Sequence, residues 1–234
     1  MKKLAWSLGA LALFLLVGGG AGYLILQHQS RPAAKASTTA AAKAGETITS
    51  AERHTLGNPD APLTVIEYAA LTCPHCAEFN EQVFPTLKSK YIDTGKVHYV
   101  LRVLPISPAD FKAEGLAACQ PKERYFSAVD TLFRRQKDWG PMQMNEHVGD
   151  MNAQPKTDAG LIRLGVEMGL DAEKARSCMY DYMLHQTVEQ IARESAGRYT
   201  ITGVPHMIVN GTEMSAPHTT DELARILDPL LEGK

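Results

Sequence analysis

Cys73 and Cys76, two cysteines separated by two residues, constrain this chain most because of where they stand. The run before them, Leu63–Ala69, is apolar and β-branched and predicts a buried central strand. The run after them places large apolar residues at helical spacing and predicts a helix over residues 74–90, kinked at Pro85. A C-x-x-C pair at a strand-to-helix junction is typical of a redox-active dithiol.

The physical reason lies in the thiolate, which is the attacking and leaving species in disulfide exchange. A cysteine at a helix N-terminus faces unpaired N–H groups and the positive end of the helix dipole. Pro74 suits the first helical position and His75 can add a hydrogen bond or a charge. Cys73 is therefore predicted to be the exposed nucleophile and Cys76 the buried resolving thiol. The alternative, half of a structural zinc site, lacks the second ligand pair that such a site needs.

Composition narrows the class of protein. The 234 residues are 44% hydrophobic and carry a formal net charge of -2, which is enough for one well-packed domain with an inserted subdomain. The sequence has no basic stripe and few aromatic residues, so we do not expect the protein to bind nucleic acid.

The first residues predict a targeting segment. Lys2 and Lys3 precede Leu4–Leu26, which carries no charge and is long enough to span a bilayer. We expect residues 1–27 to be a retained anchor, with a cleaved signal as the alternative, and residues 28–50 to be a flexible tether. Either form exports the rest of the chain, to a compartment in which disulfides persist.

Export allows the remaining cysteines to form a stable disulfide. If Cys73 pairs with Cys76, then Cys119 and Cys178 remain as a second pair, and a structural bond is the favoured interpretation. A redox-active or regulatory pair is the alternative. Four cysteines allow three pairings, so the residues alone leave the connectivity open.

The rest of the chain predicts an interrupted α/β fold. A short edge strand and a turn precede Leu63–Ala69, and Val97–Leu104 predicts a second central strand parallel to the first. Residues 51–108 thus read β-β-α-β, residues 109–200 form a helical insertion, and residues 201–234 read β-β-α. The predicted helices of the insertion are Ala109–Cys119, Lys122–Lys137, Thr157–Met168, Ala172–Leu184 and His185–Tyr199, with Thr157, Asp158 and Asp171 as possible caps.

The last third of the chain predicts a hairpin and a closing helix. Pro205–Val209 and Thr212–Met214 are the predicted strands, joined by an Asn210-Gly211 turn. Thr219–Leu231 has the helical apolar period, with Thr220 as a possible cap. Residues 139–151, with three methionines and His147, allow a soft-metal site as an alternative to gap filling or a peptide-contact surface.

These motifs together resemble the DsbA family, the thioredoxin-fold thiol oxidases of the bacterial cell envelope. The resemblance rests on residues 73–76 (Cys-Pro-His-Cys), residues 202–205 (Thr-Gly-Val-Pro), residues 209–211 (Val-Asn-Gly) and residues 56–62 (Leu-Gly-Asn-Pro-Asp-Ala-Pro), and it covers roughly residues 52–232. It implies a thioredoxin fold with an inserted all-helical subdomain. Cys119 and Cys178 match the subgroup with a second disulfide in the helical domain.

The resemblance also implies roles for residues near the cysteines. Pro205 is expected to be a cis-proline beside the active site, with the backbone of Val204 presented to an extended substrate peptide. His206 is expected near Cys73 and His75. Glu67, in the strand before the motif, is expected to be a buried acid that accepts the proton of Cys76. The alternative for Glu67 is a carboxylate held by a nearby lysine or hydroxyl group.

The implied function is that of a periplasmic thiol:disulfide oxidoreductase acting through a mixed disulfide at Cys73. Its implied partners are reduced, unfolded exported proteins and a quinone-linked membrane reoxidase of DsbB type; the chain is expected to be a monomer that needs no organic cofactor or metal. One alternative is a disulfide isomerase or reductase, although isomerases of this superfamily usually dimerise through an N-terminal domain for which residues 28–50 are too short. The other is a copper- or zinc-binding protein that uses Cys73, Cys76 and one or both of His75 and His206.

Overall fold

The computed structural model describes residues 54–141 and 154–233. The predicted anchor, the tether and His147 with most of the methionine-rich stretch lie outside these residues. Across the two described ranges, no helix is long and apolar enough to cross a bilayer.

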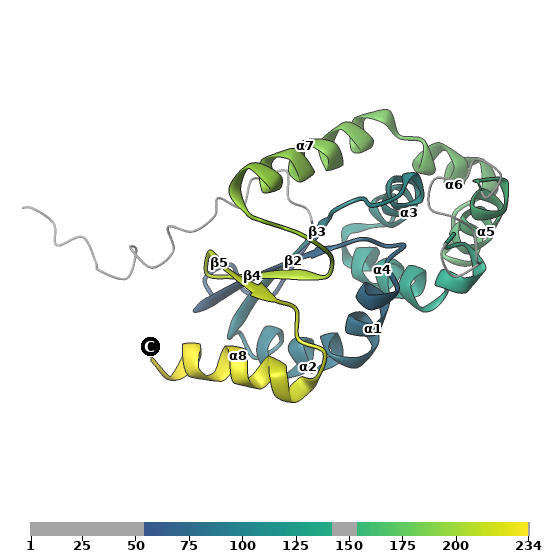
Figure 1. Cartoon of the computed structure of the whole chain (residues 1–234). Coiled ribbons are helices and arrows are strands. Elements are labelled where there is room, and N and C mark those ends of the chain that lie inside the picture. Colours follow the sequence, from purple (N-terminus) through teal and green to yellow (C-terminus); the bar gives the residue numbers. More distant parts are fainter. Residues whose placement is uncertain (1–53, 142–153, 234) are drawn as a thin grey trace, which may run out of the picture. The chain divides into compact units, whose positions relative to one another are not determined.

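A five-stranded sheet forms the centre of the described fold, in the order β1-β3-β2-β4-β5 (Figure 1). The strands are β1 (Thr55–Leu56), β2 (Leu63–Ala69), β3 (Val97–Val103), β4 (His206–Val209) and β5 (Thr212–Ser215). β2 and β3 run parallel in register from Leu63 opposite Val97, and the other pairs are antiparallel. This confirms the predicted β-β-α-β and β-β-α halves around a helical insertion.

The two faces of the sheet have different covers. Strand alternation puts Leu63, Val65 and Ala69 on the face that packs against helices α1 (Pro74–Gln82), α2 (Phe84–Leu87) and α8 (Thr220–Glu232) (Figure 1). Ile66 and Tyr68 point to the other face, where they pack near the chain that leaves helix α7 (Tyr182–Arg198). The cysteine motif, at the start of α1, therefore lies on the same side of the sheet as Leu63, Val65 and Ala69.

The helix after the motif is broken rather than kinked. α1 spans Pro74–Gln82 and α2 begins at Phe84, where a single helix over residues 74–90 was predicted. Pro85 cannot donate a hydrogen bond and its ring crowds the preceding turn, so the break falls before it. The N–H groups of Thr86 and Leu87 both bond to the carbonyl of Val83, and a π-helical turn extends to Ile92.

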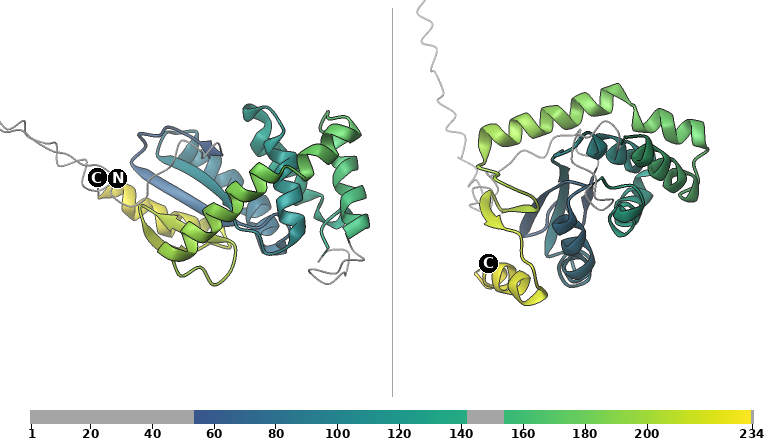
Figure 2. Two further views of the ribbon diagram at one scale, coloured as in Figure 1. Left: turned by 90° about the horizontal axis from the view of Figure 1, so that it is seen from above. Right: turned by 45° about the vertical axis from the view of Figure 1, so that its right-hand side comes forward.

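The insertion between β3 and β4 is helical, as predicted (Figure 2). It contains α3 (Pro108–Ala118), α4 (Tyr125–Arg134), α5 (Gln154–Glu167), α6 (Ala172–Met179) and α7. The prediction of one helix over Lys122–Lys137 was wrong, because short 3₁₀ turns flank α4 on both sides.

Three predicted caps differ from the observed ones. Thr157 and Asp158 lie inside α5 instead of capping it, since Asp158 accepts hydrogen bonds from Lys112 and Tyr180 at 2.6 Å each.

α7 begins after Asp181, which accepts a hydrogen bond from the N–H of Leu184, so the predicted boundary between residues 184 and 185 was wrong. At the last helix Thr219, rather than Thr220, is the cap.

The predicted hairpin turn is present. Asn210 and Gly211 have φ values of 48° and 84°, the left-handed conformations that a tight two-residue turn requires. The Asn210 side chain also accepts from the N–H of Thr64 at 2.8 Å, which ties the turn to the first central strand.

A disulfide joins Cys119 at the end of α3 to Cys178 in α6 across 59 residues, with the two Cα atoms 6.0 Å apart. Replacing both cysteines by alanine is expected to lower the free energy of unfolding by about 4 kcal/mol, because a closed loop of this length restricts the unfolded chain. Urea unfolding of the variant and the parent, both with Cys73 and Cys76 oxidised, measures this. Identical midpoints and slopes would contradict the expectation.

Candidate functional site

Cys73 and Cys76 lie at the start of α1, where the predicted strand-to-helix junction is found. Cys73 is the N-cap residue, with extended backbone angles, and its carbonyl accepts from the N–H of Ala77 at 3.2 Å. Pro74 occupies the first turn, where an N–H group would have no hydrogen-bond partner within the helix. Among the described residues these two cysteines are free thiols, and Cys76 lies one turn inside the helix with no exposed surface.

Cys73 is less open than predicted. Only 6% of its surface is exposed, because the loop before β4 covers it. The Val204–Pro205 peptide bond in this loop is cis, which confirms that expectation. The carbonyl oxygen of Val204 lies 3.5 Å from Cys73 Sγ and accepts a hydrogen bond from the thiol.

His206 follows this loop but does not join the cysteines. Strand alternation turns its side chain to the face of the sheet that carries Tyr68, and its Nε2 lies 3.6 Å from Glu213 Oε2. Within residues 54–141 and 154–233, no group of three His, Cys, Asp or Glu side chains is arranged to hold a metal ion. The ligand set of the copper or zinc alternative is thus not brought together.

The environment of Cys73 lowers its pKa to about 6. The largest cause is the hydrogen bond from the thiol of Cys76; burial opposes it, and the N–H groups of Cys76 and His75 and the charge of His75 add smaller amounts. His75 is exposed, and its Nδ1 lies 3.1 Å from Glu78 Oε2, a hydrogen bond that raises the histidine pKa. The sequence argument assigned the main effect to the helix terminus and His75, and it missed the thiol of Cys76.

Two substitutions separate these causes. Cys76→Ala is expected to raise the pKa of Cys73 by more than His75→Ser does, because the Cys76 hydrogen bond is the largest contribution and the His75 charge the smallest. The thiolate absorbance of each reduced variant, followed against pH, gives both values. An equal or larger rise in His75→Ser would show that the histidine charge dominates.

Glu67 lies on the α1 face of β2 and is 3% exposed. Its carboxylate accepts a hydrogen bond from the hydroxyl of Tyr99 at 2.6 Å, and burial raises its pKa to about 7. Burial, the neighbouring Cys73 and the negative charge of Glu67 together raise the pKa of Cys76 far above that of an ordinary thiol. A thiol that holds its proton thus lies near a carboxyl group able to gain or lose one at neutral pH.

Two side chains from the helical insertion hold the chain before Cys73. Asp110 accepts from the N–H of Thr72 at 2.7 Å and from its hydroxyl at 3.0 Å. Gln136 Nε2 donates to the carbonyls of Leu71 at 2.7 Å and of Cys73 at 3.0 Å. Sequence reasoning missed both residues. The Ser-x-x-Asp spacing of a capping box was a readable signal for Asp110, whereas Gln136 lies 63 positions from Cys73 and carries no local signal.

Three buried carboxyl groups predict an unusual pH dependence of stability. Burial raises the pKa values of Glu67, Asp110 and Glu114 to about 7, 6 and 8, against unfolded values near 4. The folded chain therefore binds protons that the unfolded chain has lost, and stability falls as pH rises. In the oxidised protein, where Cys73 does not titrate, we expect each group to lower the free energy of unfolding by about 1.4 kcal/mol per pH unit from about pH 4 up to its own folded pKa, which is about 6 for Asp110, 7 for Glu67 and 8 for Glu114, and to have no further effect above it. Unfolding free energies that stay flat from pH 5 to pH 8 would contradict this.

Comparisons with known proteins agree with this geometry. A family model described as thioredoxin matches residues 49–229. A relative from Rickettsia bellii (strain RML369-C), named as a protein-disulfide oxidoreductase, is 30% identical over 178 residues, which cover 76% of this chain and 64% of the relative. A second from Rickettsia typhi is 30% identical over 180 residues, covering 76% and 62%. The chain thus spans just under two thirds of these relatives.

Solved structures give the same fold. The crystal structure of alpha-DsbA1 from Wolbachia pipientis matches with a TM-score of 0.63 at 25% identity, covering 76% of this chain and 90% of that one. Oxidised BdbD from Bacillus subtilis matches with a TM-score of 0.63 at 22% identity, covering 76% and 92%, and supports the fold alone.

Proposed function

Because the chain belongs to the thioredoxin family and is similar to DsbA-type proteins within it, we propose that it introduces disulfide bonds into exported proteins. The observation that carries the proposal is the contrast between its two free thiols. The pKa of Cys73 is lowered to about 6 while that of Cys76 is raised, so the pair has one good leaving group and one thiol that keeps its proton.

The reaction starts from the disulfide between Cys73 and Cys76. A substrate thiolate attacks Cys73 Sγ, the bond between the two cysteines breaks, and Cys76 leaves as a thiolate that takes a proton from Glu67. A second substrate thiolate then attacks the substrate sulfur of the mixed disulfide. The substrate leaves with a new disulfide, and Cys73 leaves as a thiolate whose low pKa makes it a good leaving group.

Substrate binding is proposed at the cis-proline loop. The backbone of Val204 lies next to Cys73 Sγ and can pair with an extended peptide as an added strand. Pro205 holds that backbone toward the thiol, and Pro74 and His75 supply the helix start and the charge beside it. His206, which follows the cis-proline loop, contacts Glu213 on the other face of the sheet. Its proposed role is to support the position of that loop through this contact.

The cell location and the reoxidant complete the proposal. We place the protein in the bacterial periplasm or cell envelope, with residues 1–27 as anchor or signal, residues 28–50 as tether and residues 109–200 as the helical insertion of the catalytic domain. A quinone-linked membrane protein of DsbB type then reoxidises Cys73 and Cys76. We propose that the protein is a monomer.

The test uses the oxidised full chain and a reduced, unfolded protein with two cysteines. We expect one substrate disulfide for each Cys73–Cys76 disulfide consumed, and no transfer by Cys73→Ser. The Cys76→Ser variant, given the disulfide form of the same substrate, should accumulate a mixed disulfide at Cys73, because the thiol that resolves it is missing. Substrate thiols that stay reduced, with efficient reduction or reshuffling of disulfides by the dithiol form, would favour the reductase or isomerase instead.

A further inference from the structure

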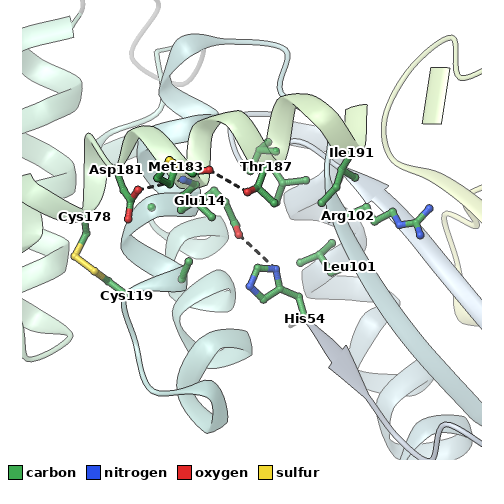
Figure 3. A pocket seen from close by; sticks show the side chains of 15 residues that line it. His54, Leu101, Arg102, Glu114, Cys119, Cys178, Asp181, Met183, Thr187 and Ile191 are labelled. Atoms are coloured by element: carbon green, nitrogen blue, oxygen red, sulfur yellow. Dashed lines mark hydrogen bonds and ion pairs between the residues drawn. A yellow bond between two sulfur atoms is a disulfide. The ribbon is translucent and has the colours of Figure 1, made fainter. Parts of the chain in front are cut away.

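A cavity of about 320 Å³ lies between the helical insertion and the sheet (Figure 3). None of the residues proposed for disulfide exchange lines it. Its apolar lining comes from β3, α3 and α7 and comprises Leu101, Val103, Ala118, Leu184, Val188 and Ile191. Mainly apolar cavities of this size at the junction of two substructures, with a few converging polar groups, are where proteins bind small molecules.

The polar group at its base is the carboxyl of Glu114, which is 1% exposed. The hydroxyl of Tyr125 donates to Oε2 at 2.9 Å, and Oε1 lies 3.4 Å from His54 Nδ1. Figure 3 shows the side chains of Glu114 and His54 directed toward each other within the cavity. A carboxylate offers about four lone-pair positions, so two further acceptor positions remain for a ligand.

The charges around the cavity favour a cation. Asp181, exposed at the mouth, adds a second carboxylate, which accepts from the N–H of Leu184. Arg102 lines the cavity, but its guanidinium points away from Glu114 (Figure 3) and donates a hydrogen bond to the hydroxyl of Tyr68 at 2.7 Å. Burial without a full counter-charge raises the pKa of Glu114 to about 8. A cationic ligand would supply the charge that this carboxylate lacks.

We propose that this cavity binds a small organic monocation, a primary ammonium group on a compact apolar body. The ammonium group hydrogen-bonds to the carboxylate of Glu114, and the apolar body packs against Leu184, Val188 and Ile191. Exposed Asp181, Met183 and Thr187 form the mouth through which it enters. Binding releases the proton of Glu114 to solvent, so affinity rises with pH until that group is ionised.

The probe is 2-phenylethylamine, titrated into the full chain by calorimetry at about pH 6 and about pH 8. We expect saturable binding to one site, about 50-fold tighter at the higher pH, since a group with a pKa of about 8 is about 1% ionised at pH 6 and about half ionised at pH 8. The neutral analogue 2-phenylethanol keeps the body and lacks the charge, and it should bind about tenfold more weakly at the higher pH. Equal affinities for the amine and the alcohol would overturn the proposal.

Variants place the binding in this cavity. Glu114→Gln keeps an acceptor for Tyr125, removes a buried acid, and should weaken amine binding about tenfold while abolishing its pH dependence. Val188→Phe fills the apolar part and should also weaken it. The control is Glu189→Gln, which removes a charge from the same helix at a residue that pairs with Arg193 outside the cavity, and should bind as the parent does.

The outcomes are separable from those of disulfide exchange, because the readout is binding alone. Saturable binding that persists unchanged in Glu114→Gln, or no saturable binding in the parent chain, would overturn the cation site whatever the oxidase assay shows. Circular dichroism of each variant confirms that loss of binding is not loss of fold.

Discussion

Glutamine at position 67 is expected to slow the attack of Cys76 on a mixed disulfide at Cys73 by about 100-fold at neutral pH. Cys76 keeps its proton because burial raises its pKa, and Glu67, with a pKa of about 7, is the buried group placed to accept it. The loss of the Glu67 charge acts in the opposite direction, but that charge is one of the smaller causes of the raised Cys76 pKa.

The measurement starts from a mixed disulfide formed between Cys73 and a chromophoric thiol, and follows release of the chromophore. In the parent the rate should rise with pH through about 7 and then level, whereas Glu67→Gln should lack this step. Glu114→Gln is the matched control, since it removes another buried carboxyl group that is bonded to a tyrosine hydroxyl. Equal release rates in Glu67→Gln and the parent would end the proposed role of Glu67.

Alanine at position 110 is expected to lower the free energy of unfolding by about 4 kcal/mol. Asp110 is fully buried and accepts from the N–H groups of Thr72, Ile106 and Ser107 as well as from the hydroxyl of Thr72. Each buried donor left without an acceptor costs about 1–3 kcal/mol, and relief of the buried charge returns part of that sum. Because Thr72 directly precedes Cys73, the same change should also slow the reaction of Cys73 with substrate thiols.

Two variants calibrate this effect. Ser107→Ala removes the other half of the capping box, a single acceptor for the N–H of Ala109, and should cost about 1 kcal/mol. Asp110→Asn keeps one acceptor oxygen and should fall between the two alanine variants. Urea unfolding gives the three values, and a cost for Asp110→Ala no larger than that for Ser107→Ala would contradict the assigned role.

Local pattern predicted the sheet well. The apolar, β-branched composition of β2 and β3 and the Asn210-Gly211 turn identified their strands within one residue at each end, since these features depend on neighbours in sequence. The family resemblance led to the cis bond before Pro205, for which local sequence carries no signal.

The errors involve partners that are far apart in the chain. Asp158 reads locally as a helix cap, but its contacts with Lys112 and Tyr180 lie 46 and 22 positions away. Gln136 was predicted only as part of a helix over Lys122–Lys137, yet it is buried and donates to the carbonyl of Leu71, 65 positions away. The pKa of Cys73 is a different case, because its main cause is a near neighbour in sequence: it depends first on the side chain of Cys76, whose orientation follows from packing rather than from the motif alone.

The central claim is that this chain donates disulfides, and an equilibrium redox titration of Cys73 and Cys76 tests it most directly. The purified protein is equilibrated in glutathione buffers, trapped by alkylation and analysed by mass, so that the active-site pair is resolved from Cys119 and Cys178. A thiolate stabilised at Cys73 favours the dithiol form, and the account predicts a potential well above that of thioredoxin, which is about −270 mV. A potential at or below the thioredoxin value would contradict the account and identify a reductant in place of an oxidase.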